Sequence, residues 1–252
     1  MKLRRLIQIE SNRQRAYENK FARSIRKALI AQAEHYLDHG YISNDMQATI
    51  NELYETIMPD YLSRQWEQLE RNDLQKKERF FIDAWRRWIS EYTITSLATK
   101  VTNIDKTTQE EISRQTLAGA TAGETTQEIQ ERIIEVFNGK ATKARARMIA
   151  RTEVGEAVNL AKTKSAQDWG AQTDEELGKL WVHRGAKDPR DWHMTLDTGV
   201  PIPINDTWTV TNPYTGETDL MKHPHDTSAS AGNVINCGCQ VIYTRLNFRR
   251  RF

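Results

Sequence analysis

The chain of 252 residues has little cysteine, with 2 residues, and only 6 prolines and 12 glycines. The two cysteines, Cys237 and Cys239, stand one residue apart, a spacing that is poorly suited to a structural disulfide. Their placement argues against a secreted scaffold held by disulfides. With 38% hydrophobic and 28% charged residues, the composition suggests long exposed helices rather than one compact globule.

Long apolar runs are also missing, and this excludes several classes of protein. Nothing approaches the roughly 20 consecutive apolar residues that a membrane helix needs. The first residues, MKLRRLIQIESNRQR, contain no apolar run of signal-peptide length. We therefore expect a protein that is cytoplasmic when made and has no membrane partner. The sequence contains no Gly-rich phosphate loop, nucleophile elbow or His-Glu-x-x-His motif, so the enzyme classes that these motifs mark are disfavoured.

The net charge of +2 hides basic ends on an acidic body. Basic residues crowd the first 27 positions, where the only acids are Glu10 and Glu18, and they recur at the C-terminus. Such ends suggest contact with a polyanion or an acidic partner surface, although solvated termini explain them equally well. The candidate DNA-binding residues are Arg4, Arg5, Arg13, Arg15, Arg23, Arg26, Lys27, Arg249, Arg250 and Arg251.

Apolar residues repeat at three- and four-residue spacing in the first part of the chain, which is typical of amphipathic helices. The stripe from Phe21 to Tyr36 predicts a helix that ends at Gly40. A second helix is predicted to begin at a cap residue among Ser43–Asp45 and to break at Met58-Pro59. From Asp60 to about Lys100 we expect another helix, whose polar centre, EQLERNDLQKKER, faces solvent or a partner.

Aromatic residues in this helical part recur on one face. Trp85, Trp88 and Tyr92 lie at helical spacing, and we interpret them as a seam between packed helices rather than a binding platform. The pattern relaxes around Val101–Thr107, where we place a domain boundary. Further on, Thr125 to Glu128 has the form of a capping box and predicts the start of a helix that Gly139 closes.

Beyond Gly170 the composition shifts toward proline, glycine, threonine and asparagine. Short alternating segments predict strands at Lys179–Arg184, Thr207–Thr211 and Gln240–Thr244. We therefore predict an α+β fold in two parts. An extended, mainly helical docking arm occupies 1–104. A C-terminal domain occupies 105–252, with helices over 105–170 and a short antiparallel sheet within the strand-rich part, 171–252.

Both cysteines and four of the six histidines lie between Leu180 and Cys239. If residues 236–240 are extended, Cys237 and Cys239 point to the same side, because strand side chains alternate. Two thiolates are half of a tetrahedral zinc site, so His193, Cys237 and Cys239 are candidate ligands of a structural zinc ion. The candidates for a fourth ligand are His183, His223 and His225.

Two other interpretations of this cluster stay open. The cysteines can be small buried residues that open the terminal strand, since free cysteine packs well in cores. Alternatively, a metal-dependent nuclease would use carboxylates to hold a divalent ion and a histidine to activate water. The carboxylates for that chemistry are Asp188, Asp191, Asp197 and Asp226.

The helix that contains ARMIARTEVGEAVN carries charges with two interpretations. Arg151 and Glu153 flank Thr152 and cannot pair across one helix face at that spacing. They are either a functional pair that points into the strand region or, as composition favours, ordinary surface charges on an amphipathic helix that buries Met148 and Ile149.

Three blocks in the stretch from about Lys140 to Tyr243 resemble the Mu-F-like phage head morphogenesis family, also called the minor head or minor capsid protein family. The first is Ile149-Ala150-Arg151-Thr152-Glu153. The second is Trp181, then Arg190-x-x-His193 and Leu196-Asp197-x-Gly199; the third is Pro224-x-Asp226 with Ile235-Asn236-Cys237-Gly238-Cys239. The signature residues that the resemblance marks are Arg151, Glu153, Trp181, Arg190, His193, Asp197, Asn236, Cys237 and Cys239.

The resemblance implies a non-enzymatic minor head protein that acts in procapsid assembly. Its implied partners are the portal protein and the head shell or scaffold. Its implied location is the virion, in the head interior or at the portal vertex, after assembly in the host cytoplasm. The basic ends fit contact with double-stranded DNA without sequence specificity. The rival functions are the metal-dependent nuclease and a zinc-stapled interaction module.

Overall fold

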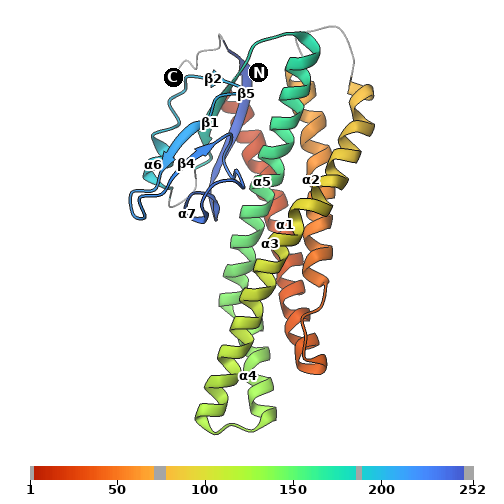
Figure 1. Ribbon diagram of the computed structural model, residues 1–252, viewed down its shortest axis with the longest axis vertical. Helices are drawn as coiled ribbons and strands as arrows, with labels where there is room; N and C mark the ends of the chain where they lie inside the picture. The colour runs from red at the N-terminus through yellow and green to blue at the C-terminus, as the bar shows by residue number, and fades with distance from the viewer. Residues whose placement is uncertain (1–2, 71–77, 186–188, 247–252) are drawn as a thin grey trace.

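The computed structural model describes residues 3–70, 78–185 and 189–246. An elongated bundle of helices carries a small strand-rich unit beside its upper half (Figure 1). The helices of the bundle are α1 (Leu3–His39), α2 (Asp45–Glu70), α3 (Glu78–Ala122), α4 (Thr126–Asn138) and α5 (Lys140–Thr173). The strand-rich unit contains β1 (Leu177–His183), α6 (Asp191–Met194), β2 (Ile202–Pro203), β3 (Trp208–Thr211), β4 (Thr218–Met221), α7 (Ala231–Val234) and β5 (Cys239–Arg245). The α+β prediction is confirmed.

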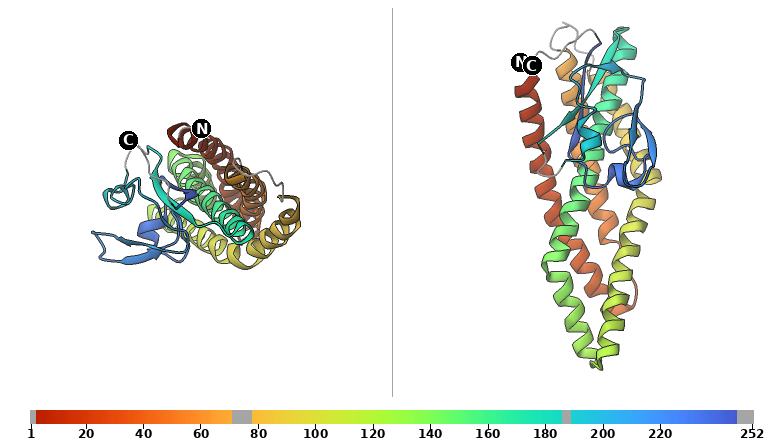
Figure 2. Two further views of the ribbon diagram at one scale, coloured as in Figure 1. Left: turned by 90° about the horizontal axis from the view of Figure 1, so that it is seen from above. Right: turned by 90° about the vertical axis from the view of Figure 1, so that its left-hand side faces the viewer.

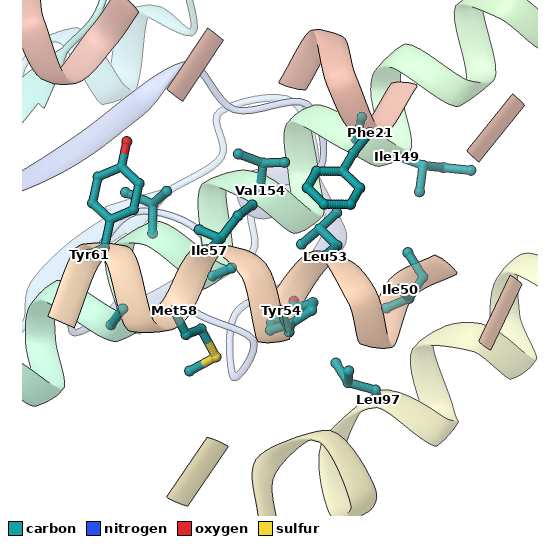
Figure 3. Close-up of a cluster of buried hydrophobic side chains, with 14 of the residues drawn as sticks. Phe21, Ile50, Leu53, Tyr54, Ile57, Met58, Tyr61, Leu97, Ile149 and Val154 are labelled. Carbon is teal, nitrogen blue, oxygen red and sulfur yellow. The ribbon is translucent and has the colours of Figure 1, made fainter. Parts of the chain in front are cut away.

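The bundle runs up and down: α1 descends from the sheet, α2 returns, α3 descends to the base, and α4 and α5 lead back up (Figures 1 and 2). Its core is one apolar cluster to which α1, α2, α3 and α5 all contribute (Figure 3). Phe21 from α1, Leu53 and Ile57 from α2, Leu97 from α3 and Val154 from α5 are fully buried in it. The aromatic seam is confirmed, because Trp85 is buried and its ring lies 5.8 Å from that of Trp66 on α2.

Local sequence signals set several helix ends. Gly40 follows α1 with φ +79°, a left-handed conformation that glycine adopts without a Cβ clash. Thr125 and Glu128 form the predicted capping box at the start of α4. Gly139 closes α4, with its N–H bonded to the Val136 carbonyl, and α5 follows directly. These predictions are confirmed. Each depends only on residues that are neighbours in the sequence, which is why the sequence alone could give them.

The predicted break at Met58-Pro59 is wrong, because α2 continues through Pro59. A proline inside a helix costs about 3 kcal/mol, since it lacks an N–H and crowds the preceding turn. Ile57 and Met58 before it, and Tyr61 and Leu62 after it, are all fully buried in the same core. Burial on both sides of the proline offsets its cost.

The segment Val101–Thr107 lies inside α3, which is unbroken there. Leu97, Val101, Thr108 and Ile112 are buried and continue one packed face of α3 through this segment. The division into two domains at this position stays a prediction. The expected helix from 60 to 100 is formed by the end of α2 and the start of α3; the centre of its polar stretch, residues 71–77, lies outside the described residues.

The main sheet has the order β2-β1-β5 and is antiparallel, and β3 and β4 form a separate antiparallel pair. The three predicted strands are confirmed as β1, β3 and β5. The first turns of α1 cover one face of the main sheet, where Leu3, Leu6 and Ile7 pack on Leu180, Val182 and Ile242. Among the described residues no helix is both long and apolar enough to cross a membrane.

Helix α5 lies along the sheet at β5 and supplies it with polar partners. Asn159 accepts a hydrogen bond from the Val241 N–H at 2.9 Å. Four residues further along α5, Thr163 accepts from the Tyr243 hydroxyl at 2.7 Å. Residues four apart share a helix face, so one face of α5 accepts both hydrogen bonds from β5. This arrangement fixes the start of β5, where Cys239 stands.

Candidate metal centre

Three predicted ligands meet in the strand-rich unit. The Nδ1 atom of His193 lies 3.4 Å from Sγ of Cys237 and 4.0 Å from Sγ of Cys239. All three ligand atoms lie within 4.8 Å of one another. The side chains of His193, Cys237 and Cys239 are buried. Two thiols and an imidazole in this arrangement form three corners of a tetrahedral metal site.

The turn that carries the cysteines is held by α5. Asn236, with φ +59°, precedes Cys237, and its N–H donates to the Thr152 hydroxyl at 2.9 Å. The Asn236 side-chain oxygen accepts from Nη1 of Arg151 at 3.2 Å. The first and third sequence blocks of the family signature therefore meet in space. Their contact holds the turn from which both sulfur atoms approach His193.

The remaining ligand, His193, is positioned by a single turn of helix, α6. Nη2 of Arg190, at the N-cap of α6, donates to the Ile235 carbonyl at 2.6 Å. Trp181 on β1 meets the His193 ring edge to face, with centroids 5.3 Å apart. Arg190 thus ties the helix that carries His193 to the turn that carries the cysteines, and the Trp181 ring closes the space beside them.

The two thiols differ in acidity. A hydrogen bond from Cys239, together with the imidazoles of His225 and His193, holds the pKa of Cys237 well below its ordinary value despite burial. Its hydrogen bond to Cys237, burial and the Cys237 charge raise the pKa of Cys239. Cys237 is therefore the sulfur that ionises first, and the thiolate is the form that binds metals.

The other histidines of the segment have different surroundings. Nδ1 of His183 accepts from the Gly185 N–H at 3.2 Å, and Nδ1 of His223 lies 2.9 Å from the Pro224 carbonyl oxygen. His225 is fully buried, and within the described residues its two ring nitrogens form no hydrogen bond to nitrogen or oxygen; the nearby group that it affects is the Cys237 thiol. Its ring lies against Gly155 of α5: a Cβ at Gly155 would stand 2.4 Å from Nε2 of His225.

The remaining signature residues hold the scaffold. Asp197 accepts from the His183 N–H on β1 at 3.1 Å. Arg151 also lies 3.9 Å from Glu18 and, with Arg15 and Arg184, lines a pocket of about 260 Å³ beside Gly238. Both interpretations of Glu153 are wrong. It is buried and bonded to Tyr54 of α2 at 2.9 Å and to Lys100 of α3 at 3.3 Å.

The carboxylates of the nuclease interpretation do not join the triad of His193, Cys237 and Cys239. Asp226 accepts from the N–H groups of Lys222 and Ser228, and Asp191 is exposed on α6. Across residues 3–70, 78–185 and 189–246, the only cluster with metal-binding geometry is the triad of two thiols and one imidazole. Asp188 lies outside the described residues.

The predicted DNA-binding residues have two kinds of surroundings on α1. Arg13 lies 3.9 Å from Asp60, and Arg15 and Arg26 donate to backbone carbonyls of other elements. The remaining four are exposed and have no ion pair or hydrogen bond within the described segments; they are Arg4, Arg5, Arg23 and Lys27. The residues Arg249, Arg250 and Arg251 lie outside the described residues.

Sequence reasoning missed three residues that build this site from α5. Thr152 holds the cysteine turn, Gly155 makes room for His225, and Asn159 binds β5. A signal existed for the second. Glycine inside a helix costs about 1 kcal/mol relative to alanine, so its presence there indicates a close approach by another group.

Comparison with known proteins places these residues in a family. The chain matches the family described as Phage Mu protein F like protein over residues 110–242, more than half of its length. The matched segment runs from α3 to β5 and contains every signature residue and the whole triad. No curated protein and no solved structure matched the chain. The protein belongs to the Phage Mu protein F like family, whose members are phage head morphogenesis proteins.

Proposed function

We propose that the protein is a minor head protein that acts in procapsid assembly, docks on the portal, and contacts packaged DNA through α1. Family membership over residues 110–242 is the observation that carries this proposal. The proposed role is non-enzymatic. It places the protein inside the head, at the portal vertex.

The outer surface of α3 supports the docking role. Ile94 and Leu117 are large apolar side chains on α3, exposed to 74% and 70%. Each is a large apolar side chain that a partner could cover. The two lie on different faces of α3, since 23 residues turn the helix by about 140° beyond whole turns. We propose that the face of α3 with Leu117 takes part in binding the portal.

Co-purification with the portal protein encoded in the same gene cluster tests the docking role. The variant Leu117→Glu is expected to co-purify less well than the parent chain. The matched control is Val200→Glu, because Val200 is 62% exposed but lies outside the bundle, in the strand-rich unit. Failure of the parent chain to co-purify would refute portal docking, and equal loss in both variants would refute the α3 contact.

The geometry of α1 supports the DNA contact. Arg5 and Arg23 are 18 residues apart, which is five turns of 3.6 residues, so they share one face and lie about 27 Å apart. Phe21 and Ile25, on the other side of α1, are fully buried. The face with Arg5 and Arg23 is therefore directed outward. Spaced arginines on one face can contact phosphates of a duplex without reading its bases.

Substitution is a sharper test than truncation, because removing α1 would uncover the sheet and the core. A variant with Arg4, Arg5, Arg23 and Lys27 all changed to Gln is expected to bind duplex DNA more weakly. Each lost phosphate contact should reduce the slope of log affinity against log salt by about 0.9. The control changes the same number of exposed charges elsewhere: Arg87, Lys106, Lys143 and Arg147 to Gln. Equal weakening in both variants would contradict a DNA site on α1.

A further inference from the structure

We propose that His193, His225, Cys237 and Cys239 form a closed tetrahedral site for a zinc-class divalent ion, which staples the loops of the strand-rich unit to β5. This proposal is independent of portal docking and DNA binding. It assigns a bound metal to a cluster that the head-assembly role does not use.

The geometry of three ligands fits the metal directly. With a zinc–sulfur bond of about 2.3 Å and a zinc–nitrogen bond of about 2.0 Å, a tetrahedron separates the sulfur and nitrogen atoms by about 3.5 Å. The observed separations from His193 Nδ1, 3.4 Å to Cys237 and 4.0 Å to Cys239, lie on either side of this value. Ion binding therefore needs only a small adjustment of side chains that are already buried together.

His225 is the fourth ligand that the structure favours. Its ring nitrogens are buried and form no hydrogen bond to nitrogen or oxygen within the described residues, a costly state that a metal bond would relieve. Its imidazole is close enough to Cys237 to lower the pKa of that thiol, and it packs against Gly155, where a larger residue would displace it. The three-residue set within 4.8 Å does not include His225, so its imidazole must turn toward the sulfurs on binding.

The backbone at His225 is also held in an unusual conformation that fixes where the side chain starts. His225 has φ +63°, a left-handed conformation that a residue with a Cβ adopts at a cost. Asp226 holds this conformation by accepting from the N–H groups of Lys222 at 2.8 Å and Ser228 at 3.0 Å. The rival ligands bond elsewhere, since His223 Nδ1 faces the Pro224 carbonyl and His183 Nδ1 accepts from Gly185.

The burial of the cluster defines the role of the ion. His193 and Cys237 are each 1% exposed, Cys239 is 2% exposed and His225 is fully buried. Catalytic zinc keeps a position open to water or substrate, whereas structural zinc is enclosed by four protein ligands. Two sulfur and two nitrogen ligands in a tetrahedron also select zinc over the hard ions magnesium and calcium. The ion would link α6, the loop between β4 and α7, and β5.

The first experiment measures metal and thiols in the full-length chain. Elemental analysis of protein purified without chelators should find about one zinc per chain. Replacement by cobalt(II) should give the visible absorption of a tetrahedral ion and the charge-transfer band of thiolate ligands. Both cysteines should react slowly with a thiol reagent until a chelator is added. No stoichiometric zinc or cobalt and unchanged thiol reactivity would overturn the proposal without the need for any variant.

The second experiment identifies the fourth ligand. The variant His225→Asn should retain cobalt with an altered spectrum and release zinc to a chelator faster than the parent chain. The matched controls, His183→Asn and His223→Asn, should leave both readouts unchanged. An unchanged spectrum in His225→Asn, or a changed one in either control, would overturn the assignment of His225. In the cobalt-substituted variant Cys237→Ser, the charge-transfer band should be weaker, because one of the two thiolate ligands is missing. A band as strong as that of the parent chain would overturn the proposed site.

Discussion

The hydroxyl of Thr152 accepts a hydrogen bond from the backbone N–H of Asn236 at 2.9 Å. Thr152 lies in the middle of α5, and Asn236 lies in the turn that leads into Cys237. Asn236 has φ +59°, so this bond also holds a left-handed backbone in place. One contact therefore connects the long helix of the bundle with the centre of the strand-rich unit.

The variant Thr152→Val should destabilise the fold by about 1–3 kcal/mol, because it keeps the shape but leaves the Asn236 N–H without its acceptor. Urea unfolding of the parent chain and the variant would measure this difference. The control is Thr95→Val, because Thr95 is exposed and its hydroxyl bonds the Glu91 carbonyl and the Ser96 hydroxyl, both in its own helix. A loss in Thr152→Val no larger than that in the control would contradict the prediction.

The two glycines within α5 should respond to alanine in opposite ways. A helix gains about 1 kcal/mol when an interior glycine becomes alanine. At Gly155 the new Cβ would lie 2.4 Å from Nε2 of His225, so Gly155→Ala should destabilise the protein. At Gly170 the nearest atom is the Glu175 carbonyl oxygen at 3.6 Å, so Gly170→Ala should be neutral or stabilising. Thermal unfolding of both variants provides the comparison, and stabilisation by Gly155→Ala would refute it.

Lys100 neutralises a buried pair of carboxylates between α3 and α5. Its Nζ lies 3.3 Å from Glu153 and also bonds Glu156, which accepts from Tyr92 as well. Lys100→Met should cost about 3–5 kcal/mol at neutral pH, because both charges lose their cation. Denaturant unfolding would measure it, with Lys106→Met, which removes an exposed lysine 4.0 Å from Glu110, as control.

The loss in Lys100→Met should also depend on pH. Burial raises the pKa of Glu156 above its ordinary 4.5, with Glu153 raising it further and Lys100 opposing both. A carboxyl whose pKa is higher in the folded state binds more protons there, so its contribution to stability is largest in acid and is lost as pH rises. The loss of stability caused by Lys100→Met should therefore become smaller as the pH falls toward the ordinary carboxyl pKa. A pH-independent loss would contradict this explanation.

Lys179 should make stability rise at alkaline pH. Burial lowers its pKa from 10.5 to about 8, although Asp206 and Asp226 oppose the shift. Between these values the unfolded chain holds a proton that the folded chain has lost, so the free energy of unfolding rises with pH, by at most about 1.4 kcal/mol per unit. Unfolding of the parent chain and Lys179→Met across this window should diverge with that slope. The control Lys106→Met, which removes an exposed lysine of α3 that is not among the charges acting on Lys179, should follow the parent chain.

The sequence predicted those features that depend on near neighbours. Apolar spacing around Phe21 predicted α1, the Thr125–Glu128 capping box predicted the start of α4, and alternation predicted β1, β3 and β5. Pro59 shows the limit of such reasoning. Local preference favours a break there, but buried residues on both sides keep α2 continuous. The short strands β2 and β4 were not predicted. Strand β2 has only two residues, and β4, with the sequence TDLM, lacks the alternation of polar and apolar residues that β3 has.

The sequence by itself determined the helical first part, the strand-rich end, and the set of His193, Cys237 and Cys239 as candidate ligands. Only the tertiary structure decided that Glu153 faces α2 and α3, that His225 rests on Gly155, and that Thr152 holds the cysteine turn. The reason is physical. Helix periodicity and capping arise from contacts within about one turn, whereas these contacts join residues 53 to 99 positions apart, which only the packing of α5 brings together.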